Sequence, residues 1–456
     1  MPQMTASAIM TLYPTPGTRM LGSLAADQQG PGRCLYWASN SQLYAVVGNT
    51  VYHVDQLWRY TILGYIQRGA TPVSMKDNAQ TIVIVDGTET GYTIDLASNT
   101  MSTIVDSTGA FVGADKVDYL DGFFIFNKPN TPQFYTSLAQ EVSFDSLYFA
   151  NKNAAPDWLV TLVVNQRQLW LIGQQTTELW YDSGASDFPF QINSSYFIQH
   201  GCAAKYSVAQ QDGNIFWLGT DPQGARIVLK GADLSAIKVS THAIENEFYD
   251  YPQVDDAIGF TYQQLGHNFY VLTFPAADKT WVYDIDQDIW HERAVVDAAG
   301  QEHRIRANGY AFAYGKHVVI DYATGALYEM SPDVYTDLGQ PILRERTFPH
   351  LVNELNRIIY RGFRADMETG DRQDVLNYAN VSDPVKASAP VLAVGFTTEP
   401  ANGNNGVPVP YTGTVNLPDE AVELAFSTTN TAPPTTGWTA ATVNGDGTWS
   451  GSVTPT

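Results

Sequence analysis

Short runs of apolar and aromatic residues recur along most of the chain at a nearly constant spacing, and this repeat restricts the possible folds more than any other feature. Each repeat has a lead-in strand, a polar turn, a very apolar strand, a second turn and a strand rich in Tyr or Trp. The repeats begin near Cys34, Pro72, Gly113, Pro156, Gly201, Asp256 and His303, at spacings of 38, 41, 43, 45, 55 and 47 residues. Propeller blades have periods of about 40–50 residues. The sequence therefore predicts an all-β fold with a β-propeller of about seven blades over residues 34–342.

A propeller blade is a sheet of four antiparallel strands around a central axis. The very apolar strand of each repeat is predicted to be the inner one, because an inner strand is covered on both faces. Trp170, Trp217 and Trp281 adjoin such runs and are predicted to be buried between blades. A pair of β-sandwiches also has short strands and frequent turns and is the alternative fold. Persistence of the period over seven repeats favours the propeller.

The remaining segments differ from the repeats in amino-acid composition and in hydrophobic pattern. Residues 1–33 are expected to form a lead-in, and 343–388 connecting strands followed by a protease-sensitive linker. Residues 389–456 are low in charge and rich in Gly, Pro, Asn and Thr, and they resemble a small bacterial immunoglobulin-like β-sandwich. Within it, 442–453 is predicted to be a hairpin, because Asn-Gly-Asp-Gly at 444–447 suits a tight turn.

Charge narrows the possible partners. The 456 residues include 25 basic and 47 acidic side chains, a formal charge of −22. Binding to nucleic acid or to an anionic membrane surface requires excess Lys and Arg, so neither is expected. Residues 1–10 contain no basic residue and no long apolar stretch, which gives no sign of secretion. The chain is expected to be soluble and made in a cytoplasm.

No motif in the sequence nominates a catalytic centre. Nucleophile elbow, P-loop, zincin and dinucleotide patterns are missing. The acidic run 284–288 suggests a calcium loop, but it lacks the Gly and the closing Glu, so a hairpin turn is preferred. Cys34 and Cys202 form no disulfide framework, although a single bridge is possible. We expect no enzyme activity, no cofactor and no metal site.

A basic cluster follows the last repeat. Its arginines alternate with apolar residues at strand-like spacing: Arg344, Arg346, Arg357, Arg361 and Arg364. Such a stripe is either the solvated face of one or two strands or a contact surface for an acidic neighbour. The second interpretation makes these five arginines the candidate interaction site.

An ordered set of motifs resembles a known family. The motifs are VNQRQLWLIG (164–173), TELWYDSG (177–184), IQHGC (198–202), GNIFWLG (213–219), KTWVYD with WHER (279–284, 290–293), and RERTFPH with DMETG (344–350, 366–370). Each is weak alone. In this order, within a chain stretch of 34–370, they resemble the packaged-DNA stabilisation proteins of short-tailed bacteriophages, also described as tail hub or tail accessory factors.

This resemblance implies a virion structural protein, assembled in the host cytoplasm and located in the virion tail. Members of the family close the portal after DNA packaging. They are expected to assemble as a six-fold ring, a hexamer, below the portal and its adaptor ring, and to carry the tail needle and the tailspikes or fibres. DNA would pass through the ring's channel without specific recognition. This head–tail connector role is the expected function.

The C-terminal part departs from the family pattern. The family has a further strand-rich segment with a Trp-Ser-Asp-Asp-Gly-Gly-type hairpin after the motif at 366–370, whereas this chain continues almost at once with 381–386 and the immunoglobulin-like stretch. Any partner held by the family's segment is therefore uncertain here. The alternative functions are a glycan-binding, adhesin-like propeller and, less favoured, a propeller glycosidase with a hidden carboxylate pair.

Overall fold

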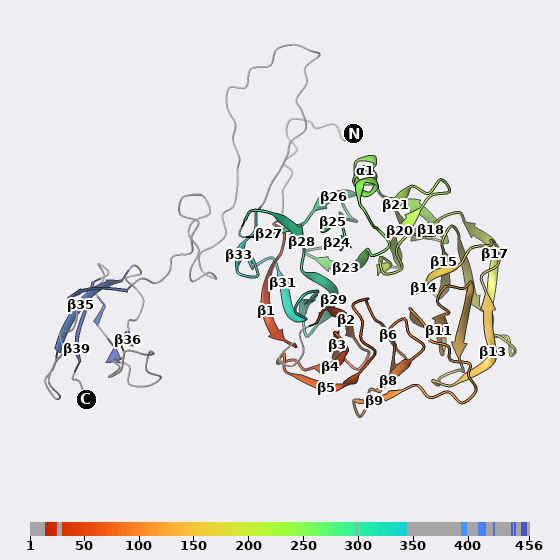
Figure 1. Ribbon diagram of the computed structural model, residues 1–456, viewed down its shortest axis with the longest axis horizontal. Helices are drawn as coiled ribbons and strands as arrows, with labels where there is room; N and C mark the ends of the chain where they lie inside the picture. Colours follow the sequence, from red (N-terminus) through yellow and green to blue (C-terminus); the bar gives the residue numbers. More distant parts are fainter. Residues whose placement is uncertain are drawn as a thin grey trace, which may run out of the picture. The chain divides into compact units, whose positions relative to one another are not determined.

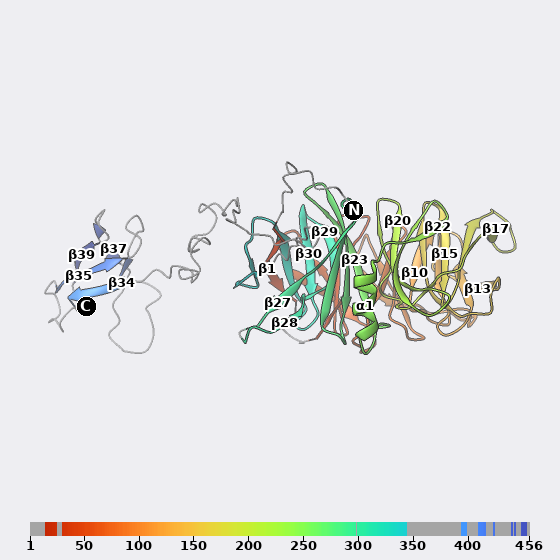
Figure 2. The ribbon, with the colours of Figure 1, turned by 90° about the horizontal axis from the view of Figure 1, so that it is seen from above.

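The computed structural model describes residues 14–24, 30–297 and 299–343, together with the C-terminal strands between residues 394 and 453. The chain divides into two compact units, Met1–Phe348 and Pro349–Thr456. In the first unit, seven larger antiparallel sheets surround a common axis, seen face-on in Figure 1 and from the edge in Figure 2. The first unit is a seven-bladed β-propeller, as the repeat predicts.

The first six blades are built from consecutive strands. Blade one contains β2 (Gly32–Trp37), β3 (Leu43–Val47), β4 (Thr50–Val54) and β5 (Tyr60–Tyr65). Blade two contains β6 (Ser74–Asp77), β7 (Thr81–Val85), β8 (Gly91–Asp95) and β9 (Thr100–Thr103). Blade three contains β10 (Val117–Leu120), β11 (Phe123–Asn127), β12 (Gln133–Ser137) and β13 (Phe144–Asn151). Blade four contains β14 (Leu159–Asn165), β15 (Gln168–Gly173), β16 (Thr177–Asp182) and β17 (Phe190–Ile198). Blade five contains β18 (Gly201–Cys202), β19 (Ala209–Gln211), β20 (Asn214–Thr220), β21 (Arg226–Ala232) and β22 (Ser235–Lys238). Blade six contains β23 (Ile258–Gln264), β24 (His267–Phe274), β25 (Lys279–Asp284) and β26 (Ile289–Glu292). A small hairpin, β27 (Ala294–Val296) and β28 (Glu302–Arg304), follows blade six.

The seventh blade combines the two ends of the propeller sequence. Its inner three strands are β29 (Ala307–Ala313), β30 (Lys316–Asp321) and β31 (Ala326–Ser331), and its fourth strand is β1 (Gly17–Ser23), which pairs antiparallel with β31. Two short strands, β32 (Thr336–Asp337) and β33 (Gln340–Pro341), extend the same sheet. Part of the expected lead-in, 1–33, is therefore a blade strand that closes the ring.

The first strand of each blade lies nearest the axis. Inner strands of neighbouring blades contact one another, for example β6 with β10, β19 with β23, and β29 with β2. The very apolar runs are instead the second strands, such as β3, in which every residue is buried. The prediction that the apolar strand is the inner one is wrong: the second strand is the one covered on both faces by neighbouring blades.

Seven hydrophobic clusters fill the spaces between the blades. Each cluster combines residues from two neighbouring blades, and the series includes one cluster between blade seven and blade one. Trp170 and Trp217 are buried in the cluster between blades four and five, with ring centroids 6.4 Å apart, as predicted. Trp281 is only partly buried and donates a 2.8 Å hydrogen bond to the Tyr251 hydroxyl.

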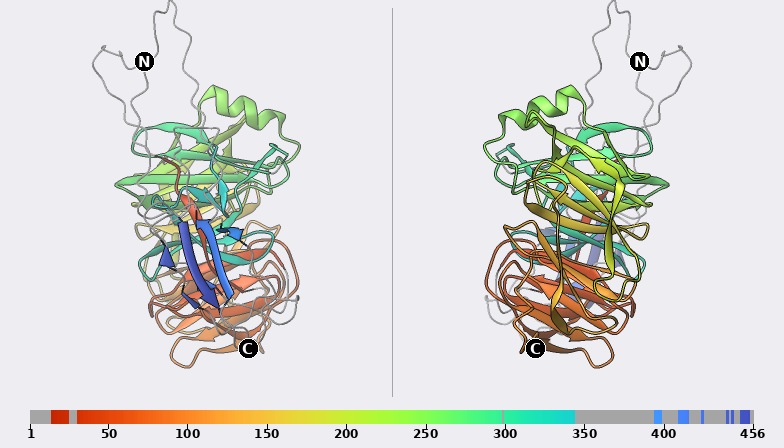
Figure 3. Two further views of the ribbon diagram at one scale, coloured as in Figure 1. Left: turned by 90° about the vertical axis from the view of Figure 1, so that its left-hand side faces the viewer. Right: turned by 90° about the vertical axis from the view of Figure 1, so that its right-hand side faces the viewer.

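The longest repeat spacing contains an α-helix that the sequence analysis did not predict. The helix α1 (His242–Asp250) joins blade five to blade six, as Figures 1 and 3 show. Thr241 caps its N-terminus, and Ile244 and Phe248 are buried against the blades. The acidic run at 284–288 forms the turn between β25 and β26, because Asp284 pairs with Ile289 across that turn. The preferred interpretation of the run as a hairpin turn is confirmed.

The described residues of the second unit form two small antiparallel sheets. One has the order β34 (Val394–Thr398), β35 (Val409–Val415), β39 (Thr448–Val453) and β38 (Thr442–Val443), and the other pairs β36 (Glu423–Leu424) with β37 (Thr439–Ala440). β38 and β39 are paired, which confirms the predicted hairpin. The immunoglobulin-like assignment stays a prediction, and the expected linker within 343–388 lies outside the described residues, apart from Leu343. Among the described helices, none has the length and apolar character needed to cross a membrane.

Candidate functional site

The Asp118 carboxylate on β10 connects three blades at the inner wall of the propeller. Its Oδ1 atom lies 2.8 Å from Lys76 Nζ on β6, and its Oδ2 atom accepts a 2.7 Å hydrogen bond from the Val164 amide on β14. Burial alone would lower the pKa of the Lys76 ammonium, but the charge and the hydrogen bond of Asp118, together with the charge of Asp77, outweigh burial and raise that pKa. One buried carboxylate thus joins blades two, three and four through charge-assisted bonds.

Hydrogen bonds between inner strands continue around the axis. The Gln210 amide on β19 donates to the Val164 carbonyl, and the Thr261 hydroxyl on β23 donates to the Gln210 carbonyl. These bonds join blades four, five and six. The Asn308 amide on β29 donates to the Gly32 carbonyl at 2.6 Å, which joins blade seven to blade one. The inner wall is therefore cross-linked by polar contacts, in addition to the apolar clusters between the blades.

Lys205 links two blades that are not neighbours. It lies in the turn between β18 and β19 of blade five, and its Nζ atom is 2.8 Å from Oδ1 of Asp115, which precedes β10 of blade three. Burial would lower the pKa of the Lys205 ammonium, but the bond to Asp115 raises it. The ion pair bypasses blade four, so it joins two blades that are not adjacent around the propeller axis.

Tyr206 extends this bridge to further blades. Its side chain interacts with Thr71, which precedes β6 of blade two, and its carbonyl accepts a 2.9 Å hydrogen bond from the Gly259 amide of blade six. The neighbouring Arg33 is buried and donates to the carbonyls of Thr71 and Gly48 at 2.7 and 2.9 Å. Residues 205 and 206 of blade five thus contact blades two, three and six, so they connect blades on different sides of the propeller axis.

The thiols near the channel are poor nucleophiles. Cys34 and Cys202 are both free, so the single bridge that the sequence left open is not formed. Burial raises the pKa of each thiol to about 12. A thiol with such a pKa is almost fully protonated at neutral pH and reacts slowly. The polar groups around the channel contact one another and are suited to holding the blades together.

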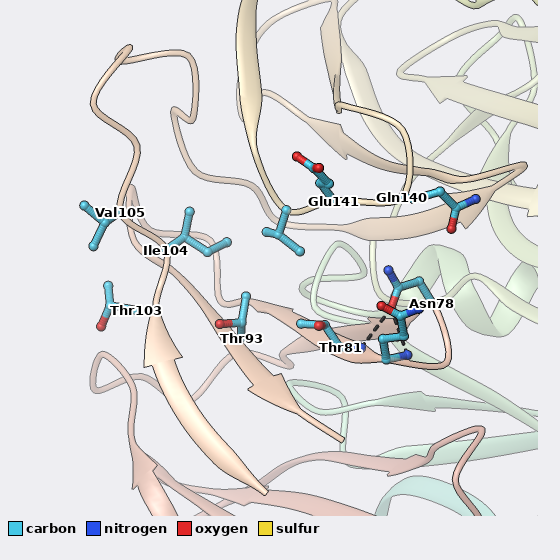
Figure 4. A pocket seen from close by; sticks show the side chains of 10 residues that line it. Asn78, Thr81, Thr93, Thr103, Ile104, Val105, Gln140 and Glu141 are labelled. Atoms are coloured by element: carbon cyan, nitrogen blue, oxygen red, sulfur yellow. Dashed lines mark hydrogen bonds between the residues drawn. The ribbon is translucent and has the colours of Figure 1, made fainter. Parts of the chain in front are cut away.

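A solvent-open cavity of about 370 Å³ lies between blades two and three, as Figure 4 shows. Its lining is Asn78, Gln80, Thr81, Thr93, Thr103, Ile104, Val105, Gln140, Glu141 and Val142. The Asn78 side-chain oxygen is already bonded to the amides of Gln80 and Thr81. The lining has no aromatic ring and a single carboxylate, Glu141. Glycosidase chemistry normally needs two carboxylates, so this cavity does not support it.

Three potential metal ligands gather near the turn after β25. One ligand atom from each of His267, Asp284 and Asp286 lies within 4.8 Å of the others. The two carboxylates already have partners, because Asp284 is bonded to His267 at 2.9 Å and to the Asp286 amide, while Asp286 accepts from the Asn268 amide. These contacts are typical of a hairpin turn. The three side chains lie at the surface and do not enclose a metal-binding site.

The predicted interaction residues lie outside the part of the chain that the structure describes: Arg344, Arg346, Arg357, Arg361 and Arg364. Sequence reasoning missed the channel contacts altogether. Lys205 and Asp115 are 90 positions apart in the sequence, and no periodic pattern relates them. The available signal is their place in the repeat, since each precedes an inner strand.

Comparison with known proteins identifies the propeller. A family model described as Phage_stabilise, the β-propeller of bacteriophage P22 Gp10, matches residues 1–335, well over half of the chain. The chain belongs to the Phage_stabilise family. Membership makes it a phage structural protein, and the matched range agrees with the propeller unit. The resemblance drawn from the ordered motifs is confirmed.

Solved propellers are similar only at the level of general fold. The N-terminal domain of Nup159 has 11% identity and a TM-score of 0.42, covering 71% of this chain and 97% of that one. The WD40 propeller of Doa1 has 11% identity and a TM-score of 0.41, with coverage of 69% and 97%. The extracellular domain of BT4673 from B. thetaiotaomicron has 10% identity and a TM-score of 0.45, with coverage of 71% and 44%. These values support no inference about function, and no curated protein matches the chain.

Proposed function

We propose that this phage structural protein is a tail hub, which closes the portal–adaptor channel after DNA packaging and retains the genome in the head. The observation that carries the proposal is the set of contacts that join blades on different sides of the propeller axis. Lys205 and Tyr206 connect blade five to blades two, three and six, and Asp118 joins three inner strands. A subunit that bears outward pressure from packaged DNA has to be rigid, and contacts of this kind restrict movement of the blades.

The partners follow from the same role. The hub binds the adaptor ring on its head side, carries the tail needle and the tailspikes or fibres on its other side, and forms a six-fold ring in the virion tail. Its net charge of −22 suits a surface past which DNA slides, because phosphate contacts that release counterions need basic groups. The five arginines of the stripe defined above would face an acidic neighbour in this assembly. The role needs no enzyme activity and no cofactor.

Genome retention tests the role directly. Heads assembled without the protein should package DNA and then lose it, and adding the purified chain to portal–adaptor particles should restore nuclease-resistant DNA. A variant with a weakened channel bridge, Lys205→Met, should restore retention less well than a variant of an exposed pair, Arg167→Met. Full DNA retention in heads that lack the protein would overturn the proposal.

Glycan binding is the alternative function. The cavity between blades two and three is its candidate site, although that lining contains no aromatic ring for a sugar to stack on. A glycan array separates the two functions, because a tail hub has no reason to retain sugars.

A further inference from the structure

The outer strands of blades three and four form an unusual rim. β13 and β17 have eight and nine residues, whereas the outer strands of blades two, five and six have four each. Large apolar side chains on both strands are exposed: Leu147 by 75%, Phe149 by 43%, Tyr196 by 41% and Phe197 by 46%. The two strands lie on the same side of the propeller, at the right in Figure 1 and facing the viewer in the right-hand view of Figure 3. We call these four residues the β13–β17 rim.

Both strands of this rim have an irregular register with the neighbouring strand of their blade. Phe144 and Phe149 on β13 lie opposite Ser137 and Tyr135, so β13 carries three residues more than β12 over that interval. β17 shows a bulge of the same size, where Phe197 and Ile192 lie opposite residues only two positions apart on β16. Bulges of this kind obstruct the pairing of a further strand with the edge. The rim therefore offers side chains to a partner, and not a free backbone edge.

The rim is nearly free of charge. β17 contains no Asp, Glu, Lys or Arg, and on β13 Asp145 is the only one. Exposed edges are usually protected by charged residues, particularly Lys, and a contiguous exposed apolar patch generally marks an interaction site. In a chain of charge −22, two copies would approach each other with least repulsion through a surface of this type.

A second surface of similar character lies on blade one. The outer strand β5 also has no charged residue and exposes Tyr65 by 58%, and Leu57 in the turn before β5 is exposed by 64%. We call these two residues the β5 rim; Figure 1 shows β5 at the lower left, on a different side from β13 and β17. A cyclic assembly joins two different surfaces of the same chain, head to tail, and this chain carries two such surfaces.

Blade positions relate these surfaces to a ring. Seven blades share a full turn, so neighbouring blades differ by about 51°, and the boundary of blades three and four lies roughly 130° from blade one. When the propeller axis is parallel to the ring axis, two contact surfaces at roughly this angle close a ring of about six or seven copies. Two surfaces on opposite sides of the propeller, about 180° apart, would instead give a straight fibre.

We propose that the β13–β17 rim of one copy docks against the β5 rim of the next copy, and that this contact joins the subunits of a ring. The purpose of the ring rests on the proposed tail-hub function, but the contact itself does not. The partner is a second copy of this chain, recognised by apolar burial between two surfaces of low net charge, because Asp55 and Arg59 beside Leu57 are paired with each other at 2.7 Å.

Sedimentation velocity of the full chain tests the contact without any portal protein. In about 1 M salt the Debye length is about 3 Å, so charge repulsion is screened and the wild type should self-associate. The variant Leu147→Asn/Phe197→Asn should weaken association at least about tenfold, and so should Leu57→Asn/Tyr65→Asn. Leu265→Asn is the matched control, because Leu265 is 63% exposed in a turn of blade six and its φ of 53° suits Asn.

A mixture of the two double variants gives the sharpest result. Each keeps one intact rim, so together they should form a heterodimer of wild-type affinity and nothing larger. The proposal is overturned by a wild type that stays monomeric at high salt, by variants that associate as the wild type does, by a control that is weakened equally, or by a mixture that shows no rescue. Capture by a portal–adaptor complex is measured separately, so loss of the hub role and loss of this contact give different outcomes.

Discussion

The Arg19 guanidinium on β1 lies 2.7 Å from the Glu329 carboxylate on β31, although the two residues are 310 positions apart. They are directly opposite each other in the antiparallel pairing of these strands. Glu329 also accepts a 2.7 Å contact from Lys316 on β30. The strand that closes the propeller is therefore held by an ion-pair cluster as well as by backbone hydrogen bonds. The stability of the propeller is thus linked to the charge of the Glu329 carboxylate.

Glu329→Gln should lower the free energy of unfolding by about 1 kcal/mol at pH 7, because partly exposed ion pairs contribute about 0–1 kcal/mol each. Burial pushes the pKa of Glu329 up, but the bonds from Lys316 and Arg19 prevail and hold it below its usual value. The contribution is therefore fully present above the unfolded pKa of about 4.3 and is lost as the pH falls through the folded pKa. Urea unfolding of both proteins at several pH values measures it. A difference between them that does not change with pH would contradict the assignment.

The bridge across the channel predicts a second effect on stability. Lys205→Met should lower the free energy of unfolding by about 1–3 kcal/mol, because it leaves Asp115 largely buried without its cation. In the double variant with Asp115→Asn, part of this loss should be recovered, and the coupling energy should be about 0.5–3 kcal/mol.

The control for this prediction is Arg167→Met. Arg167 pairs with Asp121 at 2.8 Å, but its side chain is 78% exposed, so the loss should be no more than about 1 kcal/mol. Denaturant titrations give all four values. Equal losses in the two Met variants, or additive losses at Lys205 and Asp115, would show that the bridge does not stabilise the channel.

The core between blades four and five predicts the largest single loss. Trp217 is fully buried, and its indole nitrogen donates a 3.0 Å hydrogen bond to the Gly201 carbonyl. Trp217→Ala should cost about 3–5 kcal/mol, since it leaves a cavity that neighbouring side chains fill only in part. Trp281→Ala should cost less, because Trp281 is only partly buried. Thermal unfolding compares the two, and a smaller loss at Trp217 than at Trp281 would argue against the packing described.

The blades could be predicted from sequence because each depends on local information. A run such as the one in β15 shows its burial and its turns within a few residues, and seven such runs at a propeller period indicate the number of blades. The order of strands within a blade was harder to predict from the sequence. Inner and second strands are both apolar in part, and burial on both faces belongs here to the second strand, which the repeat alone does not reveal.

Closure of the propeller by β1 and the ion pair between Lys205 and Asp115 both depend on residues that are far apart in the chain. The segment of β1 has no strong strand pattern, and its pairing with β31 follows only once seven blades are in place. Lys205 and Asp115 meet for the same reason. The helix α1 did have a local signal, a Thr241 cap with Ile244 and Phe248 at helical spacing, but nine residues give too short a period to outweigh the surrounding strands.

The arginine stripe predicts how assembly depends on salt. Reversing Arg344 and Arg346 to Glu should slow ring formation on a portal–adaptor platform, and most strongly at low salt, because charges at an interface mainly affect the association rate. In the proposed six-fold ring, subunits of charge −22 would repel one another over a Debye length of about 8–10 Å, and a basic stripe facing an acidic neighbour would offset part of that repulsion.

The Tm of the propeller should change by no more than a few degrees in this double reversal, because the two arginines follow β33, the last described strand of the propeller sheet, in sequence. Stopped-flow light scattering at two salt concentrations measures the association rate, and Arg167→Glu, an exposed arginine on blade four, serves as the charge-matched control for a single reversal. Assembly of the double reversal at the wild-type rate in low salt would show that the stripe is a solvated face. A purified wild-type chain that already sediments as a stable ring in low salt, without a platform, would show that charge repulsion does not control assembly.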